Sequence, residues 1–329
     1  RGDCDAKRNP VDFALYVTFF PQLIAGPIVR YHLIEKQLTS RQETLSNFTE
    51  GAYRFCWGLA KKVLVADQVA GVVDAAFGAP TGTPWTAGTA WVAMLAYTIQ
   101  IYFDFSAYSD MAIGLARMFG FQFPENFNRP YSAVSVTDFW RRWHMTLSHW
   151  FRDYLYIPLG GSRGSVAPAY RNLAIVFLLT GLWHGAAWTF IAWGAYHGAL
   201  LMLERASGLR DIPEHRWRIL RRGATLLLVM VGWVLFRADD MSEAGAIIRA
   251  LFSGDLAVDG KVAATLQRQT LAALGIGVLA FALPAAFVTG RVVERQAPGP
   301  MRSVLRLATL GVLFPTALAY ALVQDFSPF

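Results

Sequence analysis

The sequence predicts an all-α integral membrane protein, a polytopic helix bundle that forms one membrane domain over residues 1–329. Hydrophobic residues make up 54% of the chain, charged residues only 16%, and the mean hydropathy is +0.34. A soluble domain normally carries about 25% charged residues. The apolar residues also occur in long runs rather than in the alternating or 3.6-residue patterns of half-buried elements. These observations together predict helices embedded in lipid.

The predicted membrane spans follow the apolar runs in chain order. They cover residues 12–29, 52–77, 87–103, 104–121, 173–203, 224–236, 271–288 and 304–323. Pro21, Gly26 and Pro27 interrupt the first run, so we expect a re-entrant segment whose freed backbone groups meet protein or water. The run 173–203 exceeds the roughly 20 residues that cross a bilayer, and it is basic at both ends. It is either a hairpin of two short helices or an exception to the positive-inside rule.

The net charge of +7 indicates basic loops rather than a nucleic-acid surface. The basic residues concentrate at Lys61-Lys62, Arg141-Arg142, Arg163 and Arg171, and in residues 205–222 and 291–306. Because cytoplasmic loops are enriched in Lys and Arg, we expect these segments to face the cytoplasm. The acidic loop 239–259 and the uncharged loop 78–86 then face outward. This pattern predicts a multi-pass protein of the inner or plasma membrane whose surroundings are the lipid bilayer, with no nucleic-acid partner.

The ends of the chain suggest a portion of a longer protein. It opens on RGDCDAKRN, with neither an initiating Met nor a signal peptide, and it ends on SPF directly after an apolar run. Cys4 and Cys56 are too few for a disulfide framework. We therefore expect the C-terminal portion of a longer membrane protein.

Two Trp-His pairs, Trp143-His144 and Trp183-His184, stand out in this apolar context. Ionisable side chains at membrane depth indicate a functional site. No metal site is predicted, because His149 lies about 140° from His144 on a continuous helix, as does His197 from His184, and no cysteine or carboxylate cluster is nearby. A G-x-S-x-G elbow and a P-loop are also absent. A neutral imidazole that accepts the proton of an attacking hydroxyl fits these residues, and this chemistry suits acyl transfer.

Long motifs surround the two pairs. One reads DFWRRWHMTLSHWFRDYLYIPLGG from Asp138, and the other reads LWHGAAWTFIAWGAYHG from Leu182. FFPQLIAGPIVRY from Phe19, YFDFSAYSDMAIGLARMFGFQFPENFNRPY from Tyr102 and the C-terminal DFSPF accompany them. Together they resemble the membrane-bound O-acyltransferase family, in particular its bacterial branch of alginate O-acetyltransferases. The resemblance covers nearly the whole chain and implies a bundle with short or re-entrant helices around a central funnel or tunnel.

The resemblance also implies roles for the two histidines. His184 maps to the family's essential histidine and is expected to be the general base. His144 maps to the second functional histidine, which would position the acyl group or the other ring. A buried histidine bonded to a backbone carbonyl is the structural alternative for each. His197 fits close helix packing at least as well as a function, and His32, His149 and His215 are expected in loops or interfaces.

Other polar residues keep two interpretations each. Arg141, Arg142 and Arg152 either bind the phosphates of a coenzyme-A-type donor or anchor their segment at the membrane interface. Asp104 and Asp110 either line a cavity or hold helices together. Asp138 is expected to be a helix N-cap, and Asn126 and Asn128 are expected to serve turn geometry between prolines.

The predicted function is a membrane O-acyltransferase, in particular an O-acetyltransferase. It would use acetyl-CoA or a similar acyl thioester as donor substrate, with no bound cofactor. By resemblance the acceptor is an exported or cell-surface polysaccharide, reached directly or through an extracytoplasmic partner acyltransferase. The alternatives are O-acylation of peptidoglycan, D-alanyl transfer to a cell-wall polymer, or a non-catalytic transporter or scaffold for acyl groups. The acceptor, the acyl chain and the existence of an acyl-enzyme intermediate stay open at this point.

Overall fold

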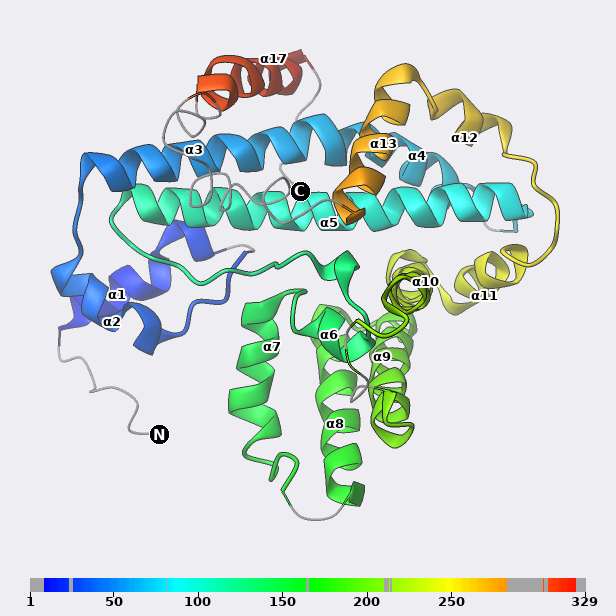
Figure 1. The fold of residues 1–329 in the computed structure, drawn as a ribbon, viewed down its shortest axis with the longest axis horizontal. Coiled ribbons are helices and arrows are strands. Elements are labelled where there is room, and N and C mark those ends of the chain that lie inside the picture. The colour runs from blue at the N-terminus through cyan, green and yellow to red at the C-terminus, as the bar shows by residue number, and fades with distance from the viewer. Residues whose placement is uncertain are drawn as a thin grey trace.

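The computed structural model describes residues 9–23, 26–80, 82–163, 166–209, 213, 215–282, 304 and 307–323, and the regular elements within them are all helical (Figure 1). The all-α prediction therefore holds for the described chain. The α-helices are α1 (Pro10–Thr18), α2 (Tyr31–Ser40), α3 (Leu45–Lys61), α4 (Asp67–Phe77), α5 (Ala87–Met118), α6 (Val136–Trp140), α7 (Met145–Phe151), α8 (Val166–His184), α9 (Trp188–Ala206), α10 (Arg218–Arg237), α11 (Met241–Ala250), α12 (Gly260–Thr265), α13 (Arg268–Ala282) and α17 (Phe314–Val323). Shorter helical turns are η1 (Phe20–Gln22), η2 (Lys62–Ala66), η3 (Pro130–Ser132), η4 (Arg152–Tyr156) and η6 (Thr309–Leu313).

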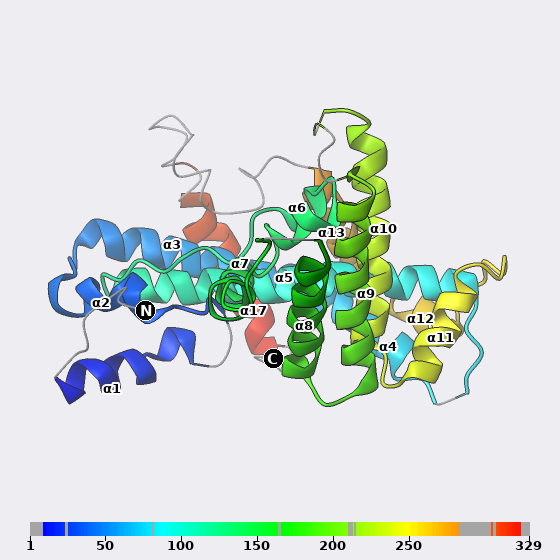
Figure 2. The same ribbon diagram turned by 90° about the horizontal axis from the view of Figure 1, so that it is seen from below.

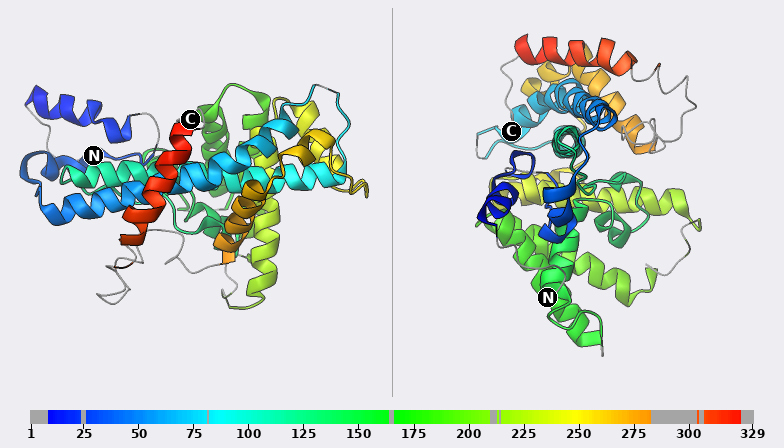
Figure 3. Two further views of the ribbon diagram at one scale, coloured as in Figure 1. Left: turned by 90° about the horizontal axis from the view of Figure 1, so that it is seen from above. Right: turned by 90° about the vertical axis from the view of Figure 1, so that its left-hand side faces the viewer.

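Helices α3 and α5 lie antiparallel and form a long middle layer (Figure 1). Helix α17 crosses over α3 on one face, and α13 packs against α4 and α5 on the same side (Figure 3). Helices α6 to α10 cover the opposite face of α5 (Figure 1). The functional histidines predicted from the sequence therefore lie on the α6–α10 side of the middle layer.

The middle layer depends on a very close approach of two backbones. A methyl group on Gly51 of α3 would lie 2.5 Å from the carbonyl oxygen of Gly114 on α5, and one on Gly114 would lie 2.6 Å from the carbonyl oxygen of Gly51. Such distances are well inside van der Waals contact, so only glycine fits at either position. The glycine pair thus brings α3 and α5 together and sets the frame for the site.

Ion pairs join α5 to α3 and to the following turn η2. Asp110 of α5 pairs with Arg54 at 2.7 Å and with Lys61 at 2.9 Å, and Asp104 pairs with Lys62 at 3.0 Å. Both lysines are about 6% exposed, inside a helical run that continues through η2 into α4. The prediction that Lys61-Lys62 forms a cytoplasmic loop is therefore wrong. The acidic partners one helix away allow the two cations to be buried.

One pair of predicted spans is also wrong. The expected spans 87–103 and 104–121 form the single 32-residue helix α5. The sequence has no Gly or Pro at their junction, and the pairing of Asp104 with Lys62 lets the helix continue through a charged position. At about 48 Å, α5 exceeds the roughly 30 Å of a bilayer's hydrocarbon core.

The ambiguous run 173–203 is a hairpin. It divides into α8 and α9 at residues 185–187, so that its two basic ends lie at the same end of the hairpin (Figure 2). Methyl groups on Gly181 or Gly194 would each lie 2.3 Å from a carbonyl oxygen of the other helix, at Phe190 and Phe177 respectively. Close backbone packing therefore favours the hairpin, and it removes the conflict with the positive-inside rule.

The remaining predicted spans are found as helices of varying length. Among the described helices, α8 and α10 are long and apolar enough, by length and composition, to cross a membrane. The span 12–29 corresponds to α1 and η1, the span 271–288 begins as α13, and the span 304–323 contains η6 and α17. Residues 24–25, 283–288 and 305–306 of these spans lie outside the described chain.

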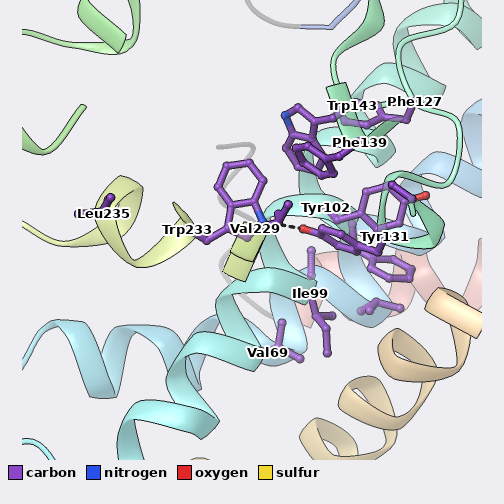
Figure 4. Close-up of a cluster of buried hydrophobic side chains, with 14 of the residues drawn as sticks. Val69, Ile99, Tyr102, Phe127, Tyr131, Phe139, Trp143, Val229, Trp233 and Leu235 are labelled. Atoms are coloured by element: carbon purple, nitrogen blue, oxygen red, sulfur yellow. Dashed lines mark hydrogen bonds between the residues drawn. The ribbon is translucent and has the colours of Figure 1, made fainter. Parts of the chain in front are cut away.

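An aromatic core fills the space between α5, α6, α9 and α10. Figure 4 shows Tyr131 and Trp233 in it, with the indole Nε1 of Trp233 donating to the Tyr131 hydroxyl at 3.0 Å. The Tyr131 hydroxyl donates in turn to the Thr98 carbonyl oxygen at 2.8 Å. Trp143 is 4% exposed in this core and stacks against Phe139 at 5.6 Å between ring centroids. This packing fixes the backbone immediately before His144.

Candidate active site

His144 sits at a strained turn between α6 and α7. Its backbone adopts φ 42° and ψ 53°, in the left-handed region that non-glycine residues seldom occupy. Two backbone hydrogen bonds hold the turn against the preceding loop: Asn128 N–H donates to the Arg142 carbonyl oxygen, and Met145 N–H donates to that of Asn126, both at 2.9 Å. The side chain of His144 is 4% exposed. Backbone strain that the surrounding structure maintains is common at functional sites.

Asn126 organises the polar contacts of His144. Its side-chain oxygen Oδ1 lies 3.0 Å from His144 Nδ1 and accepts from the Thr146 hydroxyl at 2.8 Å. The Thr146 hydroxyl accepts in turn from Ile28 N–H at 2.9 Å, so its own hydrogen is available for Asn126. The amide nitrogen Nδ2 donates to the Ser109 hydroxyl at 3.1 Å. Asn126 is fully buried, so these bonds fix its amide in one orientation.

This network assigns the tautomer of a neutral His144 ring. An amide oxygen can only accept a hydrogen bond, so Nδ1 of His144 must carry the hydrogen that it donates to Asn126. In the neutral ring Nε2 then keeps its lone pair. His144 is therefore oriented with its Nε2 free to accept a hydrogen bond.

His184 has different surroundings. It ends α8, and its ring lies edge-on to Trp193 and Phe236 at 5.1 and 5.0 Å between centroids, with Phe190 at 6.3 Å. In the described chain no residue forms a hydrogen bond with either ring nitrogen. The side chain is half-buried, so the expectation of a buried histidine is met by His144 and not by His184. The reason is that His184 lies on the wall of a cavity.

That cavity has a volume of about 280 Å³ and lies between α5 and the C-terminal ends of α8 and α10. Its lining consists of Tyr97, Gln100, Ile101, Asp104, Phe105, Tyr108, His184 and Phe236. Phe105 lines the cavity and also packs edge-on against the His144 ring at 4.8 Å. Phe105 therefore connects the His144 ring to the cavity that His184 lines. The structure therefore brings together the two histidines that the sequence singled out.

The α5 side of this cavity carries Gln100 and Asp104 together with the tyrosines Tyr97 and Tyr108. Asp104 is paired with Lys62, which also contacts Asp67 at 2.9 Å, so the carboxylate both lines the cavity and holds helices together. The side-chain oxygen of Gln100 is buried and accepts no hydrogen bond from the described residues. A buried acceptor without a partner is costly, and it is suited to a donor group on a bound molecule.

The three predicted donor-binding arginines do not converge on one place. Arg141 and Arg152 line a second cavity of about 250 Å³ among α6 to α9, whose remaining lining is Thr137, Trp140, Leu147, Ser148, Phe151, Tyr156, Leu173, Val176, Phe177, Thr180 and Leu201. Arg142 is absent from that lining and pairs with Asp138 at 2.7 Å.

Asp138 is not the N-cap of α6, contrary to the prediction. The N-cap is Ser135, whose hydroxyl accepts from Asp138 N–H at 3.0 Å, while Asp138 Oδ2 accepts from Val134 N–H at 3.2 Å. This resembles a capping box, except that Asp138 at the third helical position accepts from the residue before the N-cap rather than from the N-cap itself. Asp138 is therefore free to orient Arg142 through its other oxygen, at the helical i, i+4 spacing.

The other histidines are placed apart from the cavity lining. His197 is fully buried, its Nδ1 accepts from Trp140 Nε1 at 3.4 Å, and a methyl group on Gly232 would lie 2.6 Å from its Nε2. It thus mediates close packing of α9 and α10. His149 is half-buried on α7, and His215 is exposed. No group of three or more His, Cys, Asp or Glu side chains in the described chain could hold a metal ion.

The residues that support the two rings are not predicted from the sequence. The prolines around Asn126 suggest turn geometry for it, yet its side chain positions His144. The usable signal was an Asn in a loop between buried aromatic residues, where a polar side chain must find partners. Gln100 and Lys62 gave no local signal, because their importance comes from residues distant in the chain.

Comparison with known proteins agrees with the motifs. The profile of the MBOAT, membrane-bound O-acyltransferase family matches residues 6–212. A probable alginate O-acetylase AlgI of Azotobacter vinelandii is 50% identical over 287 residues, which cover 86% of this chain and 56% of that protein. The probable alginate O-acetylase AlgI of Pseudomonas putida is 44% identical over 346 residues, covering 100% and 70%. The peptidoglycan O-acetyltransferase of Helicobacter pylori is 44% identical over 246 residues, covering 73% and 46%.

The chain spans about half the length of several curated relatives that it matches, among them the Azotobacter protein. The family profile nevertheless covers both Trp-His pairs, the Asn126 loop and the helices α1 to α9 that position them. The chain belongs to the membrane-bound O-acyltransferase family.

Proposed function

We propose that the protein transfers an acetyl group from an acyl thioester to a hydroxyl group of an exported or cell-surface polysaccharide, with His184 as the general base. The observation that carries this proposal is the position of the His184 imidazole on the wall of a 280 Å³ cavity. The ring is half-buried and forms no hydrogen bond with any described residue. Phe105 lines the same cavity and packs against His144. The relatives named as alginate O-acetylases support the acceptor class.

The proposed reaction uses the two rings differently. A ring nitrogen of His184 accepts the proton of the acceptor hydroxyl as its oxygen attacks the thioester carbonyl carbon. The carbon–sulfur bond then breaks, and the imidazolium returns the proton to the leaving thiolate. His144 does not need to move a proton. Its Nε2, fixed in orientation by the bond from Nδ1–H to Asn126, positions the other ring or the substrates.

Acetyl-CoA or a similar thioester serves as donor substrate in this proposal, and no cofactor remains bound. Of the arginines expected to contact the donor, Arg141 and Arg152 line the mostly apolar cavity among α6 to α9, while Arg142 is outside that lining and pairs with Asp138. Because arginine forms bidentate bonds with phosphate, these two places are alternative sites for the phosphates of the donor, one at Arg142 and one at Arg141 and Arg152.

The proposed setting is the inner or plasma membrane, crossed several times, with the acceptor on the outer side and an extracytoplasmic partner acyltransferase as a further component. The α8–α9 hairpin supports this topology, since its basic ends lie together. Single-cysteine variants Thr83→Cys and Ser207→Cys test it with an impermeant reagent on intact cells. We expect labelling at position 83 only, and labelling at position 207 alone would overturn the topology.

The function itself is tested by mass spectrometry of surface glycans from cells with and without the full-length gene. We expect acetyl esters to disappear from one polysaccharide in the deletion strain. Loss of esters from peptidoglycan instead would favour the activity for which the Helicobacter relative is named, and loss of D-alanyl esters would favour transfer to a cell-wall polymer. Unchanged ester content in every glycan would contradict the proposal. A transporter or scaffold would differ by keeping its function after loss of the His184 base.

A further inference from the structure

Four arginines lie on segments that contact one another near the His144 turn, since η3 packs against α10 and Asn128 N–H donates to the Arg142 carbonyl oxygen. They come from three segments: Arg129 from the loop before η3, Arg142 from the turn after α6, and Arg218 and Arg222 from the first turns of α10. The charges of the other three act on Arg129, and those of Arg142 and Arg218 act on Arg222. We call these four residues the arginine cluster.

The cluster contains more positive charge than the described residues neutralise. Arg142 pairs with Asp138, and Arg222 donates to the carbonyl oxygen of Phe281 at 2.8 Å. Arg218 forms no ion pair in the described chain. The Nε atom of Arg129 is buried, and none of the described residues accepts a hydrogen bond from it. Among the described residues, Asp138 is the one carboxylate that pairs with an arginine of the cluster, and it pairs with Arg142 alone.

Arg129 is the least satisfied of the four arginines, because its buried Nε atom has no acceptor among the described residues. Burial and the charges of Arg222, Arg142 and Arg218 lower its pKa, although an arginine still stays protonated at physiological pH. Its backbone is also strained, with φ at 50°. Anchoring at a membrane interface would explain exposed arginines, and capping the C-terminal end of α13 would explain Arg222. Neither explains a half-buried cation that has an unused donor and like charges around it.

The cluster belongs to the same backbone unit as the candidate active site. The segments 126–129 and 142–145 run side by side through the hydrogen bonds of Asn128 to Arg142 and of Met145 to Asn126. Arg142 is two residues from His144, at most about 7 Å along the chain, and Arg129 is three residues from Asn126. A ligand held by the arginines would therefore extend beside the His144 turn.

We propose that the arginine cluster binds the phosphate groups of the acyl donor, a nucleotide-bearing thioester such as acetyl-CoA. This rests on the proposed acyl transfer and places the donor's phosphates away from Arg141 and Arg152. Several phosphates in one ligand match four cations, and arginine offers paired donors to each of them. The thioester end is then directed towards the histidines, and the apolar cavity at Arg141 and Arg152 remains for another occupant.

The direct test measures binding of coenzyme A to the purified full-length protein in lipid nanodiscs. We expect the double variant Arg129→Gln/Arg222→Gln to raise the dissociation constant about 10–100-fold, since each lost bond to a charged group costs about tenfold. The matched control Arg141→Gln/Arg152→Gln should change it less than about twofold. Arg129→Lys, which keeps the charge but not the paired donors, should fall between. Unchanged binding in the double variant, or an equal loss in the control, would overturn the proposal.

A second arm separates the donor from lipid. Acetyl-pantetheine carries the thioester without phosphates, so its turnover should be equal in the wild type and the folded double variant while turnover of acetyl-CoA falls. Native mass spectrometry reports retained anionic phospholipid. If the double variant lost bound phospholipid but kept its affinity for coenzyme A, the cluster would be a headgroup site and the proposal would be wrong. The protein could also bind coenzyme A through the arginine cluster and yet acetylate no glycan. That result would support the binding site and contradict only the proposed function.

Discussion

The two histidines of the Trp-His pairs occupy opposite kinds of environment. His144 is enclosed, held in a left-handed backbone conformation, and bonded through Nδ1 to a fully buried asparagine. His184 is half-open, surrounded by aromatic rings, and without a hydrogen bond to the described residues. A ring that must take up and release a proton needs access to its substrate, whereas a ring that orients something must itself be held. The comparison therefore favours His184 as the base and His144 as a positioning residue.

The largest effect is expected at His184. His184→Gln should lower acyl transfer about 10²–10⁴-fold, because glutamine keeps a polar side chain but cannot take up the proton. The protein should still fold, since the ring forms no hydrogen bond with described residues and loses only aromatic contacts worth about 0.5–1.5 kcal/mol each. Acetyl transfer by purified full-length protein, with thermal unfolding as a check, measures this. Turnover near the wild-type rate would show that His184 is structural.

A smaller effect on turnover is expected when the hydrogen bond between Asn126 and His144 is removed. Asn126→Ala removes the acceptor of His144 Nδ1 and of the Thr146 hydroxyl, so the ring can rotate or change tautomer. We expect turnover to fall about 10–100-fold, the equivalent of roughly 1.4–2.7 kcal/mol. The control Ser109→Ala removes only the partner of the Asn126 amide nitrogen and should cost much less.

The outcome at Asn126 distinguishes orientation from mere stability. If Ser109→Ala and Asn126→Ala reduced activity equally, loss of packing would explain both, and the positioning role of Asn126 would fail. Imidazole chemical shifts of His144 provide a second measurement, because the Nδ1–H tautomer should be lost in Asn126→Ala and kept in Ser109→Ala.

The all-helical character of the described chain could be predicted from the sequence, whereas helix continuity could not, and the roles of His144 and His184 stay predictions. Apolar runs predict helices, but the single helix α5 continues through Asp104 because Lys62 neutralises it from another helix. The same pairing buries Lys62, although a Lys-Lys pair is typical of a loop in the local sequence. The charge partner lies 42 positions away, beyond the reach of any local pattern, and the hairpin break at 185–187 depends on equally distant backbone contacts.

The site shows the same limit. Long motifs identified His144 and His184, because the family motifs are local and specific. The supporting Asn126 was interpreted as a turn residue, since its partners Ser109 and Thr146 become neighbours only in the folded chain. Arg141 and Arg142 are adjacent in sequence and were expected to act together, yet they line different regions. Arg141 is the C-cap of α6 and Arg142 follows in a turn, so adjacency in sequence does not imply a shared site.

A modest effect on turnover is expected at Thr146, whose hydroxyl donates a hydrogen bond to the same Asn126 oxygen that His144 contacts. Thr146→Val keeps the shape but removes the hydroxyl that donates to Asn126 and accepts from Ile28 N–H. We expect a loss of turnover of about 3–10-fold, in line with one or two neutral hydrogen bonds. Thr180→Val is the matched control, because that hydroxyl bonds only to Val176 of its own helix. Equal losses in the two variants would remove Thr146 from the positioning network.

The smallest effect is expected at His149, one turn beyond the strained position and on the same motif. Its side chain is half-buried, forms no hydrogen bond with the described residues, and lies outside the lining of the His184 cavity. His149→Ala should therefore change acetyl transfer less than about twofold, and His215→Ala at an exposed position should behave alike. The measurement is informative because His149 shares its sequence context with His144 but none of its bonds. If His149→Ala lowered acetyl transfer as much as Asn126→Ala, any disturbance of the 138–156 segment would be enough to reduce activity. The difference between the fixed His144 ring and the unbonded His184 ring would then no longer explain catalysis.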